Sequence, residues 1–156
     1  MSRQRQMWGE VVNKMQVKLP ALSVNEGMAR AAVAAFVSQL DPSVTELADI
    51  KCAVSEAVTN AIVHGYRDHS GMAYITVTVS ILAGRSVKIE IKDRGCGIPN
   101  VRQAREPLYT TDAAGERSGM GFTVMESFTD TLRVSSKVGK GTTVTMYKKL
   151  SERGRI

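Results

Sequence analysis

Glu56 and Asn60 are the pair of polar residues whose types and spacing best fit chemistry on phosphates. A carboxylate can accept the proton of an attacking hydroxyl, and an amide oxygen is a hard ligand that suits Mg²⁺ beside phosphates and water. A spacing of four places the two side chains on one face of a helix, one turn apart. The pair predicts a general base and a metal ligand on a helix, although an ordinary polar helix face has the same pattern.

A second group of residues follows an expected strand and reads Asp93-Arg-Gly95-Cys-Gly97. An aspartate at a strand end can accept a hydrogen bond from an exocyclic amine such as that of adenine. The two glycines allow backbone conformations and close approaches that side chains would block. A simple turn is the alternative, because Asp and Gly are common turn residues.

Two further glycine segments complete the set of candidate site residues. Gly119 and Gly121 stand at an expected helix start, where amide hydrogens and the helix dipole favour phosphate, and Arg117 can add a charge-assisted contact. Thr143, in Gly141-Thr-Thr, can supply a hydroxyl near a bound base. A hinge, a solvated surface charge and an unremarkable turn are the alternatives for these residues.

Hydrophobic periodicity indicates the elements that must position these residues. Capping-box patterns at Ser23 and at Ser43 predict helices over 24–40 and 44–64. Period-two alternation predicts a hairpin through 75–81 and 87–91, a short strand at 17–21, and strands at 131–136 and 142–148. A helix over 120–128 and an irregular stretch over 93–118, whose part at 106–118 is expected to act as a lid, complete a two-layer α+β sandwich.

The bulk composition indicates one soluble domain. The chain has 156 residues, 43% of them hydrophobic and 23% charged, which is ordinary for a globular protein. We expect an extension at 1–15, a domain at 16–150 and a basic tail at 151–156. The net charge of +6 comes from residues 1–20 and 148–156, and the segment between them is neutral, so we expect no direct nucleic-acid binding. The two cysteines form no CxxC pair and no apolar run approaches 18 residues, so no membrane span and a cytoplasmic location are expected.

The order of the motifs narrows the function. ExxxN on a helix, DxGxG after a strand, GxG at a helix start and GTT into a strand resemble the GHKL ATP-binding pattern. That resemblance implies a mixed, mainly antiparallel sheet with about three helices on one face. A Walker P-loop and the signatures of eukaryotic-type kinases are missing from the sequence.

Longer segments resemble one family within that superfamily, the anti-sigma-F factors. These segments are Leu22–Arg30, Val54–Tyr66, Pro107–Thr111 and Glu116–Glu126. The family consists of serine protein kinases from spore-forming bacteria that bind and inhibit a sporulation sigma factor as homodimers. They use ATP and Mg²⁺ to phosphorylate, and thereby inactivate, a small anti-anti-sigma protein on serine.

The resemblance implies a role for each matching residue. Glu56 is expected to be the general base, Asn60 the Mg²⁺ ligand, and Arg30 a contact for the protein partners. The residues expected to bind the nucleotide are Asn60, Asp93, Gly95, Gly97, Arg117, Gly119, Gly121 and Thr143.

The sequence departs from the family at two places: residues 1–15 precede the usual start, and Asp112 stands where relatives commonly place Lys. Two alternatives share the fold, a sister kinase acting on a general-stress sigma factor and a non-catalytic, ATP-dependent sigma-binding module. The presence of a base at Glu56 favours a catalytic protein.

Overall fold

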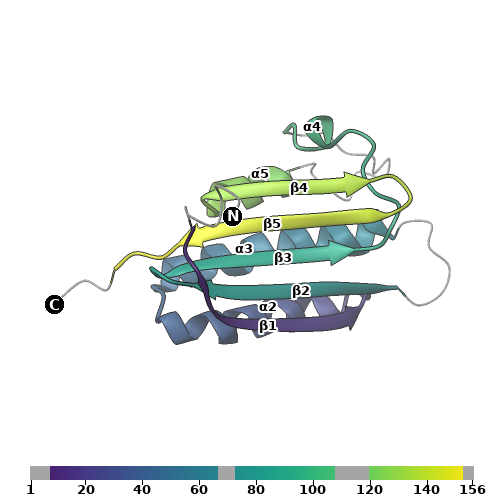
Figure 1. The fold of residues 1–156 in the computed structure, drawn as a ribbon. Coiled ribbons are helices and arrows are strands. Elements are labelled where there is room, and N and C mark those ends of the chain that lie inside the picture. Colours follow the sequence, from purple (N-terminus) through teal and green to yellow (C-terminus); the bar gives the residue numbers. More distant parts are fainter. Residues whose placement is uncertain (1–7, 67–72, 108–119, 153–156) are drawn as a thin grey trace.

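A single antiparallel sheet forms one layer of the molecule (Figure 1). The computed structural model describes residues 8–66, 73–107 and 120–152. The strands, which lie in the order β1-β2-β3-β5-β4, are β1 (Val11–Pro20), β2 (Tyr74–Leu82), β3 (Ser86–Asp93), β4 (Thr131–Lys137) and β5 (Gly141–Lys149). Each pairing among the described strands is antiparallel, where the expected sheet was mixed.

Three helices cover one face of this sheet (Figure 1). They are α2 (Asn25–Val37), α3 (Val44–Asn60) and α5 (Gly121–Phe128). A short 3₁₀ turn, Ser38–Leu40, extends α2, and a π-helical turn, Ala61–Gly65, extends α3. The predicted two-layer α+β sandwich is therefore confirmed.

The core lies between the helices and the inner face of the sheet. Val87, Ile89 and Ile91 of β3 are each at most 1% exposed, as are Ile50 and Val58 of α3. Because side chains alternate between the two faces of a strand, the same row ends at Asp93, which is only 5% exposed. The core pattern thus places this carboxyl on the helix side of the sheet.

The two predicted capping boxes have different outcomes. Ser43 accepts from the Glu46 amide at 3.0 Å, and the Glu46 carboxylate accepts from the Ser43 amide at 2.9 Å, as predicted. The box predicted at Ser23 is wrong: α2 begins after Val24 with no side-chain cap. The carboxylate of Glu26 instead pairs with Arg30, one turn further along α2.

Three other features differ from the sequence expectations. β1 begins at Val11, inside the segment expected to be an extension. A short helix, α4 (Val101–Ala104), lies in the stretch expected to be irregular, and the side chain of Asn100 caps it. Part of the charge assigned to basic tails belongs to the sheet, since Lys14 and Lys18 lie in β1 and Lys148 and Lys149 lie in β5.

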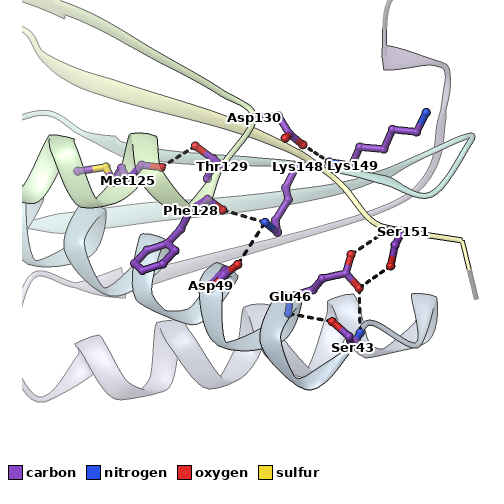
Figure 2. Close-up of polar contacts among 10 residues, drawn as sticks. All are labelled: Ser43, Glu46, Asp49, Met125, Phe128, Thr129, Asp130, Lys148, Lys149 and Ser151. Atoms are coloured by element: carbon purple, nitrogen blue, oxygen red, sulfur yellow. Dashed lines mark hydrogen bonds and ion pairs between the residues drawn. The ribbon is translucent and has the colours of Figure 1, made fainter.

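Hydrogen bonds and an ion pair join the end of β5 to the first half of α3 (Figure 2). Glu46 Oε2 accepts from the Ser151 amide at 2.7 Å, while its Oε1 serves the capping box. Lys148 Nζ donates to the Phe128 carbonyl at 3.0 Å and lies 3.6 Å from Asp49 Oδ2. One carboxylate, Glu46, therefore joins a helix start to the chain that follows the last strand.

We expect Glu46→Ala to lower the free energy of unfolding by about 1 kcal/mol, or the melting temperature by about 3 °C, as for the loss of a helix cap. Burial alone raises the pKa of the Glu46 carboxyl, but the amides and hydroxyls of Ser43 and Ser151 outweigh it, so this pKa lies below its usual value. Because the pKa is lowered on folding, the ionised carboxyl stabilises the fold at pH values above its unfolded-state pKa of about 4.3. This stabilisation is lost as the pH falls through the folded-state pKa.

Thermal melts at neutral pH and near pH 3, followed by circular dichroism, check this prediction. The difference in melting temperature between the wild type and Glu46→Ala is expected to be smaller at the acidic pH. Glu152→Ala, which removes an exposed carboxylate beside Ser151, is the control and should melt like the wild type. An equal deficit at both pH values would contradict the role given to the Glu46 charge.

Candidate nucleotide-binding site

The side chains of Glu56 and Asn60 both face the start of α5. A Cβ atom placed on Gly121 would lie 3.0 Å from Asn60 Nδ2, 3.2 Å from Asn60 Oδ1 and 3.3 Å from Glu56 Oε2. Only a residue without a side chain leaves this space open. The predicted helix face and the second glycine of the predicted phosphate loop therefore meet in the structure.

The start of α5 has the features of an anion-binding helix end. Its N-cap, Met120, makes no side-chain cap hydrogen bond, and no basic or acidic residue occupies the first turn of the helix. The first amides of a helix have no acceptor within the helix, and the dipole favours negative charge at this end. The amides of α5 are thus available to phosphate beside the Asn60 amide.

Asp93 is the buried carboxyl of the candidate site. Its Oδ1 accepts from the Gly95 amide at 2.9 Å. Burial raises the pKa of this carboxyl above its usual range, and hydrogen bonds from the amides of Gly95 and Thr142 offset part of that rise. A carboxylate can accept more hydrogen bonds than the two from these amides. Because Asp93 continues the apolar row of β3, its carboxyl suits recognition of an amine on a flat apolar base.

The loop after β3 is held closely against the end of the α3 helical run. The Cys96 amide donates to the Gly65 carbonyl at 2.7 Å, and a Cβ on Gly95 would lie 1.7 Å from that carbonyl oxygen. Gly97 has a φ of +78° and approaches the turn between β4 and β5. The two glycines of the motif are therefore required by backbone packing around Asp93.

The hydroxyl next to Asp93 belongs to Thr142, where the sequence predicted Thr143. Asp93 pairs with Thr142 across the sheet, whereas Thr143 pairs with the exposed Lys92 and points to the helix-free face. Thr142 is 7% exposed, and its Oγ1 lies 2.8 Å from Ser136 Oγ. The structure therefore places Thr142, rather than the predicted Thr143, beside Asp93, since adjacent residues of a strand face opposite sides.

Sequence reasoning also missed Ser136 of β4, which fixes the far end of the glycine loop. Its Oγ accepts from the Ile98 amide at 2.7 Å. A serine within a strand carries no sequence signal for such a contact, because the bond joins residues 38 positions apart.

The other predicted residues are either outside the described part of the chain or on α2. Arg117, Gly119 and Asp112, with nearly all of the expected lid, lie outside the described residues. Arg30 lies on α2, where its Nη1 donates to Glu26 Oε1 at 2.7 Å and to Ser55 Oγ at 3.1 Å. The predicted partner contact on α2 is therefore bonded to Ser55, the residue before Glu56 on α3.

Most of the chain is similar to known proteins of one family. The model of the histidine kinase-like ATPase domain family matches residues 19–148. The anti-sigma F factor of Anoxybacillus flavithermus is 55% identical over 141 residues, which cover 90% of this chain and 94% of the relative. That of Clostridium acetobutylicum is 52% identical over 139 residues, covering 89% and 95%.

The chain belongs to the anti-sigma F factor family.

Solved structures of other proteins share the fold of this chain. The RsbU and RsbW domains of a Mycobacterium tuberculosis protein give a TM-score of 0.66 at 22% identity, covering 92% of this chain and 34% of that one. A mycobacterial sensor histidine kinase, MprB, gives 0.53 at 14% identity, covering 88% and 100%. Within the described residues of this family member, no helix is long and apolar enough to cross a membrane.

The residues present fit a bound nucleotide with a divalent cation. The ATPase domain family implies ATP. The amides at the start of α5 could hold its phosphates, and Asp93 could accept from the amine of its base. Asn60 offers an amide oxygen beside the start of α5, 3.2 Å from the position of a Cβ on Gly121. No cluster of three or more His, Cys, Asp or Glu side chains suited to a metal occurs in the described part of the chain. A cation at Asn60 would therefore need phosphate and water as its other ligands, which is usual for Mg²⁺.

Proposed function

We propose that this chain is an anti-sigma factor and serine kinase, which inhibits a sporulation sigma factor and phosphorylates an anti-anti-sigma protein with Mg²⁺ and ATP. The observation that supports it most is the convergence of Glu56, Asn60 and Gly121 within 3.3 Å of one point. A carboxylate beside a phosphate-binding helix end is the arrangement that transfer to a hydroxyl needs. The relatives are named anti-sigma F factors, which supports a sigma factor as one partner.

Each residue has one task in the proposed transfer. Glu56 accepts the proton of the partner's serine hydroxyl, so that the serine oxygen bonds to the terminal phosphorus as the bond to the bridging oxygen breaks and ADP leaves. Asn60 holds Mg²⁺, which when bound offsets phosphate charge. The start of α5 binds phosphate oxygens, and Asp93 holds the adenine amine. Arg117 and Gly119 remain predicted phosphate contacts.

The N-terminal part of α2 is the proposed contact surface for protein partners. Three apolar side chains in this part of α2 and just before it are more than half exposed: Leu22 at 53%, Val24 at 79% and Met28 at 55%. Arg30 follows within the same helix and keeps 39% of its side chain exposed. Apolar area around a partly exposed arginine is the composition of a protein-binding hot spot. A homodimer in the cytoplasm completes the proposal, by family resemblance.

The test is phosphate transfer by the purified chain to an anti-anti-sigma protein, with labelled ATP and Mg²⁺. We expect the label on the partner to resist acid and to be lost in alkali, as is usual for phosphoserine. A phosphohistidine would show the opposite stability and would contradict the serine assignment. Nucleotide binding without transfer would instead support a non-catalytic module. Retention of a general-stress sigma factor in place of the sporulation factor would indicate the sister kinase.

A further inference from the structure

Tyr66 lies directly after the π-helical turn that extends α3, and its hydroxyl joins two other segments. The hydroxyl donates to the Tyr74 carbonyl at the start of β2, at 2.5 Å. It also accepts from the amide of Arg94, the residue after Asp93, at 2.8 Å. One phenol therefore ties the end of the Asn60 helix to the first residue of the loop that follows β3.

The residue before Tyr66 touches Asp93 itself. A Cβ on Gly65 would lie 2.9 Å from Asp93 Cγ and 3.0 Å from each carboxylate oxygen. The Gly65 carbonyl accepts from the Cys96 amide at 2.7 Å. The Asp93 carboxyl thus lies against bare backbone, and its loop is bonded to Gly65 on one side and to Tyr66 on the other.

A π-helical turn widens the helix and is often found at functional sites. Here it spans Ala61–Gly65, directly after Asn60, and brings Gly65 and Tyr66 to the loop. Because Asp93 and Arg94 share a peptide unit, the acceptor of the Arg94 amide helps to set where the Asp93 carboxyl points. Without the hydroxyl, that amide would lose its acceptor, and the loop would lose one of its hydrogen bonds to the helical run, beside those from the amide and the thiol of Cys96.

We propose that Tyr66 is a positioning residue for adenine recognition: its hydroxyl fixes the Asp93 loop relative to the helix that carries Asn60. The inference deepens the proposed function and rests on it, since it assumes that Asp93 reads the exocyclic amine. Burial raises the pKa of the Tyr66 phenol, with a further contribution from Asp93 and an opposing one from the Arg94 amide. The hydroxyl therefore keeps its proton at neutral pH and donates to the Tyr74 carbonyl.

The test compares the binding of ATP and inosine triphosphate, which has a carbonyl in place of the exocyclic amine. Calorimetric titrations with Mg²⁺ use the full chain. The wild type is expected to bind ATP about 10-fold or more tightly than inosine triphosphate, as for one charge-assisted hydrogen bond. In Tyr66→Phe, the Kd for ATP should rise by about 5-fold while that for inosine triphosphate changes by less than about 2-fold, because only the amine contact is lost.

Tyr74→Phe is the matched control, since Tyr74 contributes its backbone carbonyl to this network and the residue is 42% exposed. It should keep the wild-type ratio. An unchanged ratio in Tyr66→Phe, or an equal weakening of both nucleotides, would overturn the positioning role. Failure of the wild type to bind ATP would instead overturn the proposed function.

A second variant keeps the test decisive if Tyr66→Phe melts below the assay temperature. Gly65→Ala leaves the hydroxyl in place and puts a methyl group within 3.0 Å of the Asp93 carboxylate. It should reduce the ratio of the two affinities as well. A wild-type ratio in this variant would show that adenine recognition does not depend on the junction at residues 65 and 66, and would overturn the inference.

Discussion

Replacement of Glu56 by Gln is expected to slow phosphate transfer to the partner by about 10²–10⁴-fold, the usual contribution of a general base. Gln keeps the size and the hydrogen-bonding capacity of the side chain but does not accept the serine proton. Glu56 lies beside Asn60 and Gly121, so its neighbours and the phosphate-binding helix end stay in place. The Kd for ATP is therefore expected to stay within about 2-fold of the wild-type value.

Single-turnover transfer of labelled phosphate and calorimetric titration with ATP measure the two quantities on the same preparation. Glu126→Gln is the matched control, because Glu126 is an α5 carboxylate that pairs with Arg105 away from the site. It should transfer at the wild-type rate. Unchanged incorporation of phosphate in Glu56→Gln would exclude this residue as the base.

The second large effect is expected from Asp93→Asn, which should raise the Kd for ATP by about 10- to 100-fold. The oxygen of Asn can still accept from the amides of Gly95 and Thr142, the partners of the carboxyl in the folded chain. Its NH₂ group would then face the adenine amine, so that two donors meet where a donor and an acceptor met before. Calorimetric titration with Mg²⁺ and ATP measures the change.

The same substitution is not expected to destabilise the fold. Because the pKa of Asp93 is raised in the folded state, its stabilising contribution is present at low pH and is lost as pH rises through that pKa. At neutral pH, Asn removes the penalty of a buried charge, so the variant should melt at or above the wild-type temperature. Asp130→Asn, which changes an exposed carboxylate that accepts from the Lys149 amide, is the control and should bind ATP normally. An unaltered Kd in Asp93→Asn would contradict the adenine assignment.

Local patterns in the sequence were sufficient for the framework of the site. Three signals each depend only on residues close in the sequence. They are the spacing of Glu56 and Asn60, the alternation through β2 and β3, and the capping box at Ser43. Such signals survive folding because tertiary contacts reinforce them. The fold class, the hairpin and the helix that starts at Gly121 were predicted for this reason.

Other features depend on contacts that no local pattern encodes. Ser23 has the spacing of a cap, yet Asn25 donates to the Pro20 carbonyl and Glu26 pairs with Arg30, so the helix begins later. Which threonine faces Asp93 depends on the register between β3 and β5. The bond from the Arg94 amide to Tyr66 spans 28 positions, and nothing in the sequence around either residue indicates it.

The proposed nucleotide site is formed by the α3 helical run, the start of α5 and the loop after β3. Titration of the isotope-labelled chain with Mg²⁺ and ATP, followed by amide resonances in two-dimensional NMR, tests it residue by residue. We expect the amide resonances of Gly65, Gly95 and Gly121 to shift and to saturate together at one nucleotide per chain, while those of Ser43 and Ser151 do not shift. Shifts confined to the helix-free face of the sheet, or none at saturating nucleotide, would contradict it.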